Sequence, residues 1–249
     1  MSSKTSWNPD QYEKFKNERS QPFFDLMEMV QPVPHGRAVD LGCGTGELTS
    51  ALHKYLQTDS CVGIDSSPEM LAKAEAFAGD GLSFKSGNIL DWREPEKYGV
   101  IFSNAAIQWV DHHPQIFKNL YDSLVTNGQL AVQMPMNHDY PTHTIAHEMS
   151  HESHWKNLSL GQTYEQGNRM LSADAYARLL YKLGFKEQNV SMKVYGHILE
   201  SREGVVEWVK GTMLTHFKSR LSPEHYEEFV REYKKRLFAV LPDEKPFYY

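Results

Sequence analysis

Cysteine, basic residues and long apolar runs are all scarce in this sequence. Only two cysteines occur, Cys43 and Cys61, so we expect reduced thiols, as in the cytosol, and no disulfide framework. Lysine and arginine total 26 against 32 aspartates and glutamates, and the formal net charge of −6 argues against a general nucleic-acid binder, which needs a basic face. No run of about eighteen apolar residues occurs, so no membrane-spanning helix is expected.

The N-terminal stretch, MSSKTSWNPDQYEKFKNERS, also lacks the apolar core of a signal peptide. What the chain does have is 40% hydrophobic and 12% aromatic residues in 249 positions, which is enough for a large buried core. We therefore expect a cytoplasmic, monomeric protein that binds neither membranes nor nucleic acid.

Short apolar runs alternate with amphipathic stretches through the first 135 residues. The apolar runs predict strands at 37–42, 60–65, 82–87, 99–104 and 129–135. The amphipathic stretches predict helices at 47–57, 67–78 and 113–128. Ser67 and Pro68 are typical of the N-cap and first position of a helix, and Asn127-Gly128 is a helix stop signal. Continuous apolar strands separated by helices predict an α/β fold with a doubly wound, mostly parallel sheet.

The composition and the pattern of the sequence change at residue 136. The segment 136–170 is histidine-rich, polar and helix-leaning, and the remainder predicts a helix at 172–185 capped by Ser172, a strand at 188–199 and amphipathic stretches at 203–218 and 223–240. We predict that residues 1–135 form the α/β core with an N-terminal cap helix. Residues 136–249 are expected to add a helical lid, a sixth strand and C-terminal helices to the same domain.

The stretch VDLGCGTGEL carries the strongest functional signal. A strand ends at Asp40, a loop with Gly42, Gly44 and Gly46 follows, and a helix begins. Glycines let the backbone approach a ligand closely, and the helix N-terminus offers unpaired N–H groups. In doubly wound folds this carboxyl edge of the sheet is where ligands bind.

Two cofactor classes compete for this loop. The dinucleotide fingerprint G-x-G-x-x-G requires a glycine where Glu47 stands, so it fails. The carboxylate of Asp40 suits a cation, such as the ammonium of a methionine moiety, and is poor for pyrophosphate. Asp65 ends the second predicted strand, where a carboxylate can accept both hydroxyls of a ribose. The pair predicts a nucleoside-type cofactor.

The chain resembles the class I S-adenosylmethionine (SAM) methyltransferases, and within them the trans-aconitate methyltransferase family. The resemblance rests on WNPDQYEKFKNERSQP, VDLGCGTGELT, GIDSSPEMLAKA, NILDW, IFSNAAIQWVDH, NGQLAVQMP and PTH, which occur in the family's order over about residues 7–145. It implies a Rossmann-like fold, SAM as cofactor with S-adenosylhomocysteine (SAH) as product, and methylation of a carboxylate of a small organic acid, giving a monomethyl ester.

The resemblance also implies roles for single residues. Asp40, Gly42 and Gly44 would hold the methionine part of SAM and Asp65 its ribose. The other implied cofactor contacts are Ser66 beside the adenosine, Asn88 and Ile89 at the adenine edge, and Asn104 and Ala105 at the sulfonium. The family usually has an acid at position 88, but an amide oxygen can also accept from the adenine amino group. An N-terminal helix would bring Tyr12 and Arg19 to the pocket.

A carboxylate acceptor is already ionised at pH 7, so no residue is required as acid or base. Charge disappears as the methyl moves, and a strong cation on the reacting carboxylate would stabilise the ground state more than the transition state. We therefore predict that Trp109 and Tyr12 orient the reacting group while Arg19 grips a spectator carboxylate. The alternatives are a core aromatic for Trp109 and a solvated helix face for Arg19.

Residues 147–151 read HEMSH, which matches the zinc-binding pattern H-E-x-x-H. The third ligand of the extended motif is missing, because Asn157 stands at its position, and twelve histidines make a chance match common. We expect no metal. Among these histidines, His138 and His143 lie nearest the strand edge and are candidate weak donors to an anionic substrate.

Three questions stay open in the sequence. The acceptor could instead be a fatty-acyl, terpenoid or carrier-bound malonyl carboxylate, and the chain could be a SAM-binding module without turnover. Methyltransferases of this class usually end with an antiparallel strand beside the sixth, whereas this chain stops at PFYY. We expect either a truncated chain or an open sheet edge.

Overall fold

The computed structural model describes residues 16–159, 161–164 and 170–249. The described chain forms two compact units. The sheet unit contains residues 20–135 and the described residues of 169–192, and the helical unit contains the described residues of 1–19 and 136–168 together with 193–249. The assignment of both parts to a single domain stays a prediction. No helix in the described ranges is long and apolar enough to cross a membrane.

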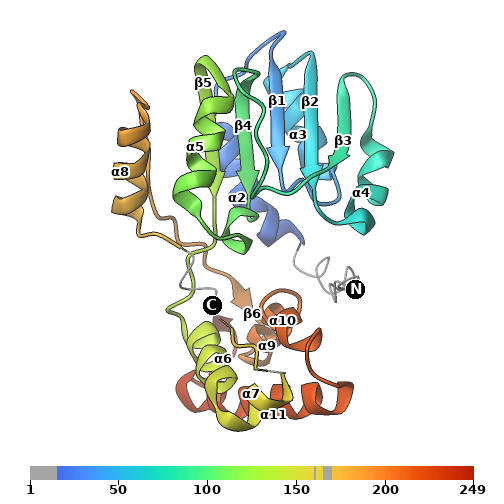
Figure 1. The fold of residues 1–249 in the computed structure, drawn as a ribbon. Helices are drawn as coiled ribbons and strands as arrows, with labels where there is room; N and C mark the ends of the chain where they lie inside the picture. The colour runs from blue at the N-terminus through green and yellow to red at the C-terminus, as the bar shows by residue number, and fades with distance from the viewer. Residues whose placement is uncertain (1–15, 160, 165–169) are drawn as a thin grey trace. The chain divides into compact units, whose positions relative to one another are not determined.

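The sheet unit is built on five parallel strands in the order β3-β2-β1-β4-β5 (Figure 1). The strands are β1 (Arg37–Leu41), β2 (Ser60–Asp65), β3 (Leu82–Ser86), β4 (Tyr98–Asn104) and β5 (Leu124–Gln133). The order reverses direction between β1 and β4, which defines a doubly wound sheet. The predicted fold class and all five core strands are confirmed, with bounds shifted at some ends.

Helices cover both faces of this sheet, because strand side chains alternate between them. Ala38 and Val100 face a core shared with α2 (Lys16–Glu28), α3 (Glu47–Leu56) and α4 (Pro68–Ala74). Val39 and Ile101 face a second core shared with α5 (His113–Ser123) and α8 (Ala173–Leu183). The Ser67 hydroxyl accepts from the Met70 amide at 3.3 Å, which confirms the predicted cap of α4. Residues 75–77 continue α4 as the 3-10 turn η1 (Glu75–Phe77).

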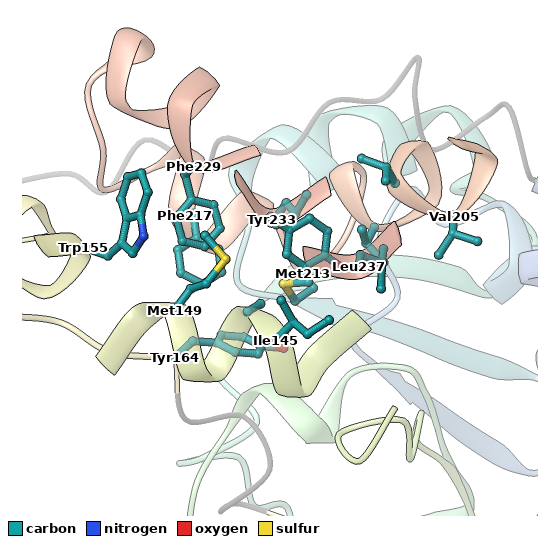
Figure 2. Packing of buried hydrophobic residues seen from close by; sticks show 14 of the residues in the cluster. Ile145, Met149, Trp155, Tyr164, Val205, Met213, Phe217, Phe229, Tyr233 and Leu237 are labelled. Atoms are coloured by element: carbon teal, nitrogen blue, oxygen red, sulfur yellow. The ribbon is translucent and has the colours of Figure 1, made fainter. Parts of the chain in front are cut away.

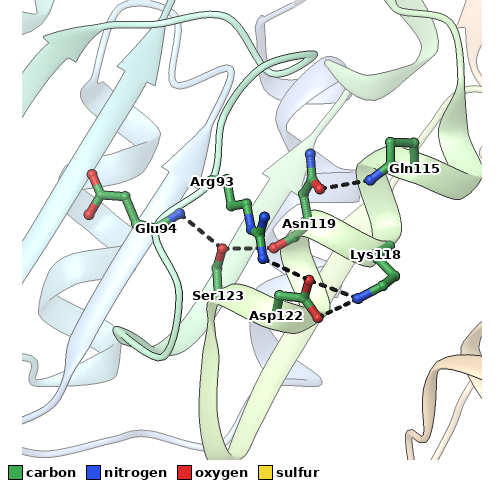
Figure 3. A network of polar contacts seen from close by, with 7 residues as sticks. All are labelled: Arg93, Glu94, Gln115, Lys118, Asn119, Asp122 and Ser123. Atoms are coloured by element: carbon green, nitrogen blue, oxygen red, sulfur yellow. Dashed lines mark hydrogen bonds and ion pairs between the residues drawn. The ribbon is translucent and has the colours of Figure 1, made fainter.

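The predicted helix 113–128 is wrong at its end, since α5 stops at Ser123 and β5 begins at Leu124. The carbonyls of Asp122 and Ser123 accept the amides of Glu96 and Lys97 at 3.0 Å, so the loop before β4 satisfies the helix end. The Ser123 hydroxyl accepts the Glu94 amide at 3.1 Å (Figure 3). The Asn-Gly pair instead lies inside β5, where the register with β4 shifts.

The helical unit packs five helices around an aromatic core (Figure 2). They are α6 (Pro141–His151), α7 (Ser153–Leu158), α9 (Glu203–Lys210), α10 (Thr215–Lys218) and α11 (Pro223–Val240). Phe229 stacks on Phe217 with 4.2 Å between ring centroids and meets Trp155 edge-on at 5.0 Å. The Tyr233 hydroxyl donates to the Thr142 carbonyl at 2.9 Å and ties α11 to α6.

The predicted strand 188–199 is wrong over most of its length. Only β6 (Ile198–Leu199) is a strand, and it pairs antiparallel with β7 (Phe247–Tyr248) in a separate two-stranded sheet. The alternating side chains of Met192 and Val194 are 67% and 77% exposed, because no described strand pairs with this segment to bury one of its faces. The stretch 203–218 divides into two helices, since α9 ends at Lys210 with Gly211 as its C-cap and α10 begins at Thr215.

Candidate functional site

The loops after β1 and β4 meet at the carboxyl edge of the sheet, where the strand order reverses. Gly42, Gly44 and Gly46 all have positive φ, at 83°, 55° and 77°, a region that strongly favours glycine. A Cβ on Gly42 would lie 2.2 Å from the Cβ of Ala106, so the two loops touch and no side chain fits between them. A Cβ on Gly44 would meet nothing within 4 Å, so this part of the loop faces open space.

Asp65, at the end of β2, binds the glycine loop. One carboxylate oxygen accepts the Gly44 amide at 2.9 Å and the other accepts the Ser67 amide at 2.8 Å. Each oxygen keeps lone-pair capacity for a ligand hydroxyl. Ser66, next in the chain, is exposed. The N–H at the centre of the glycine loop is therefore committed to Asp65.

Asp40 is a buried carboxyl group at the start of the same loop, with a residue exposure of only 3%. Burial raises its pKa to about 7, and the negative charge of Asp65 adds to the rise. The Thr49 hydroxyl opposes this rise by donating to Asp40 Oδ2 at 2.6 Å. Sequence reasoning missed Thr49, whose only signal was a small hydroxyl on the first turn of α3. Burial also raises the pKa of the Cys43 thiol, which stays protonated.

Asn88 and Ile89 follow β3. The Asn88 side-chain oxygen accepts the Leu90 amide at 3.0 Å, which forms a local turn and leaves that oxygen one further acceptor position. Asn88 is exposed and Ile89 is half-buried. The Ile89 side chain lies 3.8 Å from where a Cβ on Gly42 would stand, so it borders the glycine loop.

Asn104 ends β4, on the other side of the glycine loop, and Ala105 follows it. Asn104 lies opposite Gln133 of β5 in the register, and Ala105, with φ of 52°, donates its amide to the Gln133 carbonyl at 3.0 Å. The side-chain oxygens of Asn104, Gln108 and Gln133 are buried and accept no hydrogen bond from any described residue. Sequence reasoning did not single out the two glutamines, since nothing in one sequence shows that two strand ends are neighbours.

Trp109 ends the 3-10 turn η2 (Ile107–Trp109) and is 49% exposed, so it is not a core aromatic. His113 holds this turn in place. Its Nε2 lies 3.1 and 2.9 Å from the carbonyls of Ile107 and Val110 and must donate there, so Nδ1 accepts the Tyr176 hydroxyl at 2.5 Å.

The described residues do not test the remaining predicted substrate contacts, which stay predictions. Tyr12 lies outside the described residues, and Arg19 lies in α2. His138 and His143 belong to the helical unit. His143 is only 6% exposed, and burial lowers its pKa to about 4, so the ring is neutral at pH 7.

The HEMSH stretch lies on α6, where His147, Glu148 and His151 are exposed. The ring centroids of His147 and His151 lie 4.3 Å apart, and His151 Nδ1 donates to the His147 carbonyl at 2.8 Å. Over the described residues no group of three or more histidine, cysteine, aspartate or glutamate side chains could hold a metal ion.

Comparison with known proteins defines the class first. A family profile described as a methyltransferase domain matches residues 14–190. Trans-aconitate 2-methyltransferase of Deinococcus radiodurans is 38% identical over 98% of this chain and 94% of its own length. The enzyme of the same name from Streptomyces avermitilis is 36% identical over 95% of this chain and 90% of its own. The chain thus belongs to the trans-aconitate 2-methyltransferase family, and the resemblance drawn from its motifs is confirmed.

Solved structures agree with the fold. The YcgJ protein of Bacillus subtilis is similar with a TM-score of 0.57 and 14% identity, over 85% of this chain and 82% of that one. Phosphoethanolamine N-methyltransferase 2 of Haemonchus contortus, in complex with S-adenosylhomocysteine, is similar with a TM-score of 0.51 and 18% identity, over 88% and 48%. At these identities the likeness concerns the architecture, which is that of the doubly wound sheet described above.

Proposed function

We propose that this protein transfers a methyl group from SAM to a carboxylate of a small organic acid, trans-aconitate or a related polycarboxylate, and releases the monomethyl ester and SAH. Relatives with the name of this activity support the reaction and the acceptor. We also propose that it acts as a cytoplasmic monomer.

One observation carries the choice of cofactor: the carboxyl edge is rich in acceptors and poor in donors. Asp40 and Asp65 supply carboxylates, while the Gly44 amide is spent on Asp65. Such a site fits a ligand that carries an ammonium, a sulfonium and ribose hydroxyls, and it repels pyrophosphate. The residues we assign to SAM are Asp40, Gly42, Gly44, Gly46, Asp65, Ser66, Asn88, Ile89, Asn104 and Ala105.

When bound, SAM supplies an electrophilic methyl group, which forms a bond to a carboxylate oxygen while the C–S bond pair stays on sulfur and yields the neutral thioether. The protein moves no proton in this reaction, so its residues act by orientation and by exclusion of water. Trp109 is 49% exposed and follows the carboxyl end of β4, and we assign it and Tyr12 to the reacting carboxylate. Arg19 is assigned to a spectator carboxylate, with His138 and His143 as further substrate contacts.

The test is transfer of a tritiated methyl group from SAM onto a panel of mono-, di- and tricarboxylates. We expect base-labile label on trans-aconitate or a close polycarboxylate, because esters release their label in base. If only a fatty-acyl, terpenoid or carrier-bound malonyl acid became labelled, the proposed acceptor would be wrong and that acid would be the substrate. SAM binding without label on any acid would indicate a module without turnover.

The role of Arg19 is tested by Arg19→Ala, with Arg178→Ala as the matched control on an exposed stretch of α8. Loss of one bidentate pair is expected to raise KM for a tricarboxylate by about 10- to 100-fold and to leave the affinity for SAM unchanged. Unchanged KM and kcat would refute the assignment.

A further inference from the structure

Three buried amide oxygens, at the ends of β4 and β5 and in the turn η2, accept no hydrogen bond within the described part of the chain: Asn104 Oδ1, Gln133 Oε1 and Gln108 Oε1. Burying an acceptor without a donor is costly, and native proteins rarely do so without a functional reason. Three such oxygens on neighbouring segments therefore point to a ligand that brings donors.

The strand register places two of them on the cofactor side of the sheet. Phe102 lies opposite Asp40 of β1 and opposite Ala131 of β5, and two residues further on Asn104 lies opposite Gln133. Because side chains alternate along a strand, Asn104 and Gln133 project from the same face as Asp40. They stand one step nearer the carboxyl edge, where the glycine loop begins.

Gln108 adds the third oxygen from the loop that touches the glycine turn. Its side chain is 2% exposed, and its Nε2 donates to the Ala105 carbonyl at 2.7 Å, which fixes the amide with its oxygen unused. The same loop places Ala106 against Gly42. The three amide oxygens thus come from the end of β4, the turn η2 that follows it and the end of β5, on the β4 side of the glycine loop.

We propose that Gln133 and Gln108, together with Asn104, present these oxygens to the methylsulfonium group and make the site prefer SAM over SAH. The proposal rests on the proposed function. Methyl hydrogens on a sulfonium are polarised and are attracted to carbonyl oxygens, whereas the SAH thioether carries no such group. Neutral oxygens can select the cation without a fixed anion that would over-stabilise the ground state. Preference for SAM also favours release of the product.

The experiment measures the Kd of SAM and of SAH by calorimetry and compares the ratio Kd(SAH)/Kd(SAM) between variants. Gln133→Met removes the oxygen at similar size, and the ratio should fall about threefold, the scale of a weak C–H···O contact. Gln133→Glu places a negative charge at the same point, and the ratio should rise. Gln108→Met should also lower the ratio, while thermal unfolding separately records the loss of its bond to Ala105.

Gln129→Met is the matched control. Gln129 lies in the same strand, but its side chain is satisfied by Gln31, whose amide it accepts at 2.8 Å and to whose carbonyl it donates at 2.9 Å. The ratio Kd(SAH)/Kd(SAM) of Gln129→Met should equal that of the wild type. Equal changes in both affinities, or the same direction of change for Gln133→Met and Gln133→Glu, would overturn the inference. Wild-type protein that fails to bind SAM would instead overturn the proposed function.

Discussion

The two units differ in the buried side-chain acceptors that they leave without a hydrogen bond. In the helical unit, buried hydroxyls are satisfied locally: Ser150 donates to the His147 carbonyl at 2.7 Å, and Ser159 donates to the Gln162 carbonyl at 2.7 Å. Its one unpaired buried side-chain atom among the described residues is Arg202 Nε, whose guanidinium donates elsewhere to backbone carbonyls. These buried hydroxyl and guanidinium groups stabilise the packing of the helical unit through hydrogen bonds within the protein.

In the described part of the sheet unit, by contrast, three buried amide oxygens accept no hydrogen bond, and all three lie near the carboxyl ends of β4 and β5. Asn104, Gln108 and Gln133 have free oxygens, and Asp40 has a carboxyl group whose pKa is raised to about 7. We infer that polar groups with a hydrogen-bond partner in the protein stabilise the fold, whereas the unpaired acceptors near the ends of β4 and β5 are available to a ligand.

The largest effect should come from the helical core and should leave cofactor binding alone. Phe229→Ala removes a fully buried ring that packs on Phe217 and Trp155, and about 3–5 kcal/mol of unfolding free energy should be lost. Urea unfolding measures this, and calorimetry on the still-folded protein should give wild-type SAM affinity. Tyr181→Ala, at an exposed aromatic of α8, is the control. A matching loss of SAM affinity would break the comparison.

Gly42→Ala should have the next largest effect, and on binding. The new Cβ would overlap Ala106 at 2.2 Å in a backbone conformation with φ of 83°, so SAM affinity should fall by about 100-fold, near 2.7 kcal/mol. A Cβ at Gly44 would have open space around it, so Gly44→Ala should lower the affinity for SAM less than Gly42→Ala. Gly161→Ala, a positive-φ glycine of the helical unit with equal space, should keep wild-type affinity. Equal losses in all three would mean that backbone strain, not the loop contact, decides.

The pH dependence of binding sharpens the role of Asp40. A cationic cofactor needs the ionised carboxylate, and with a pKa of about 7 the ionised fraction grows as pH rises. SAM affinity should therefore increase about tenfold from pH 6 to pH 8. Thr49→Val removes a hydrogen bond that lowers this pKa, so the midpoint should move to higher pH. Asp40→Asn should bind weakly at every pH, and a persisting pH profile in that variant would assign the titration to another group.

The raised pKa of Asp40 also affects the free energy of unfolding, which should fall as pH rises while the affinity for SAM increases. The unfolded chain loses the Asp40 proton near pH 3.8, while the folded protein keeps it to about pH 7, so this group's contribution to stability falls between those values as pH rises. SAM should offset that loss, and the shift in unfolding midpoint on adding SAM should be larger at pH 8 than at pH 6.

The smallest effect should follow metal removal. EDTA, and the substitutions His147→Ala and His151→Ala, should leave methyl transfer unchanged, because these exposed histidines of α6 lack a third ligand among the described residues. A loss of activity that zinc restores would contradict this and would give the helical unit a chemical role.

Local signals were sufficient for much of the fold. The strands of the sheet unit are continuous apolar runs, and Ser67 with Pro68 marks the start of α4, so period and capping chemistry alone located them. The end of α5 could not be found this way. It depends on amides of the loop before β4, which are about 25 residues away in the chain and reach the helix only after the strands pair.

The glycine turn, the carboxylates at 40 and 65 and hence the class of cofactor could be predicted from the sequence, because these features lie within single strand-loop-helix units. The groups that lie beside them depend on how the helices and strands pack. Thr49 on Asp40, and Gln133 beside Asn104, follow from helix packing and strand register. Residues 188–196 show the opposite case. Their polar and apolar residues alternate as in a strand, but a strand also needs a neighbouring strand to pair with, and the period of the sequence does not show whether one is present.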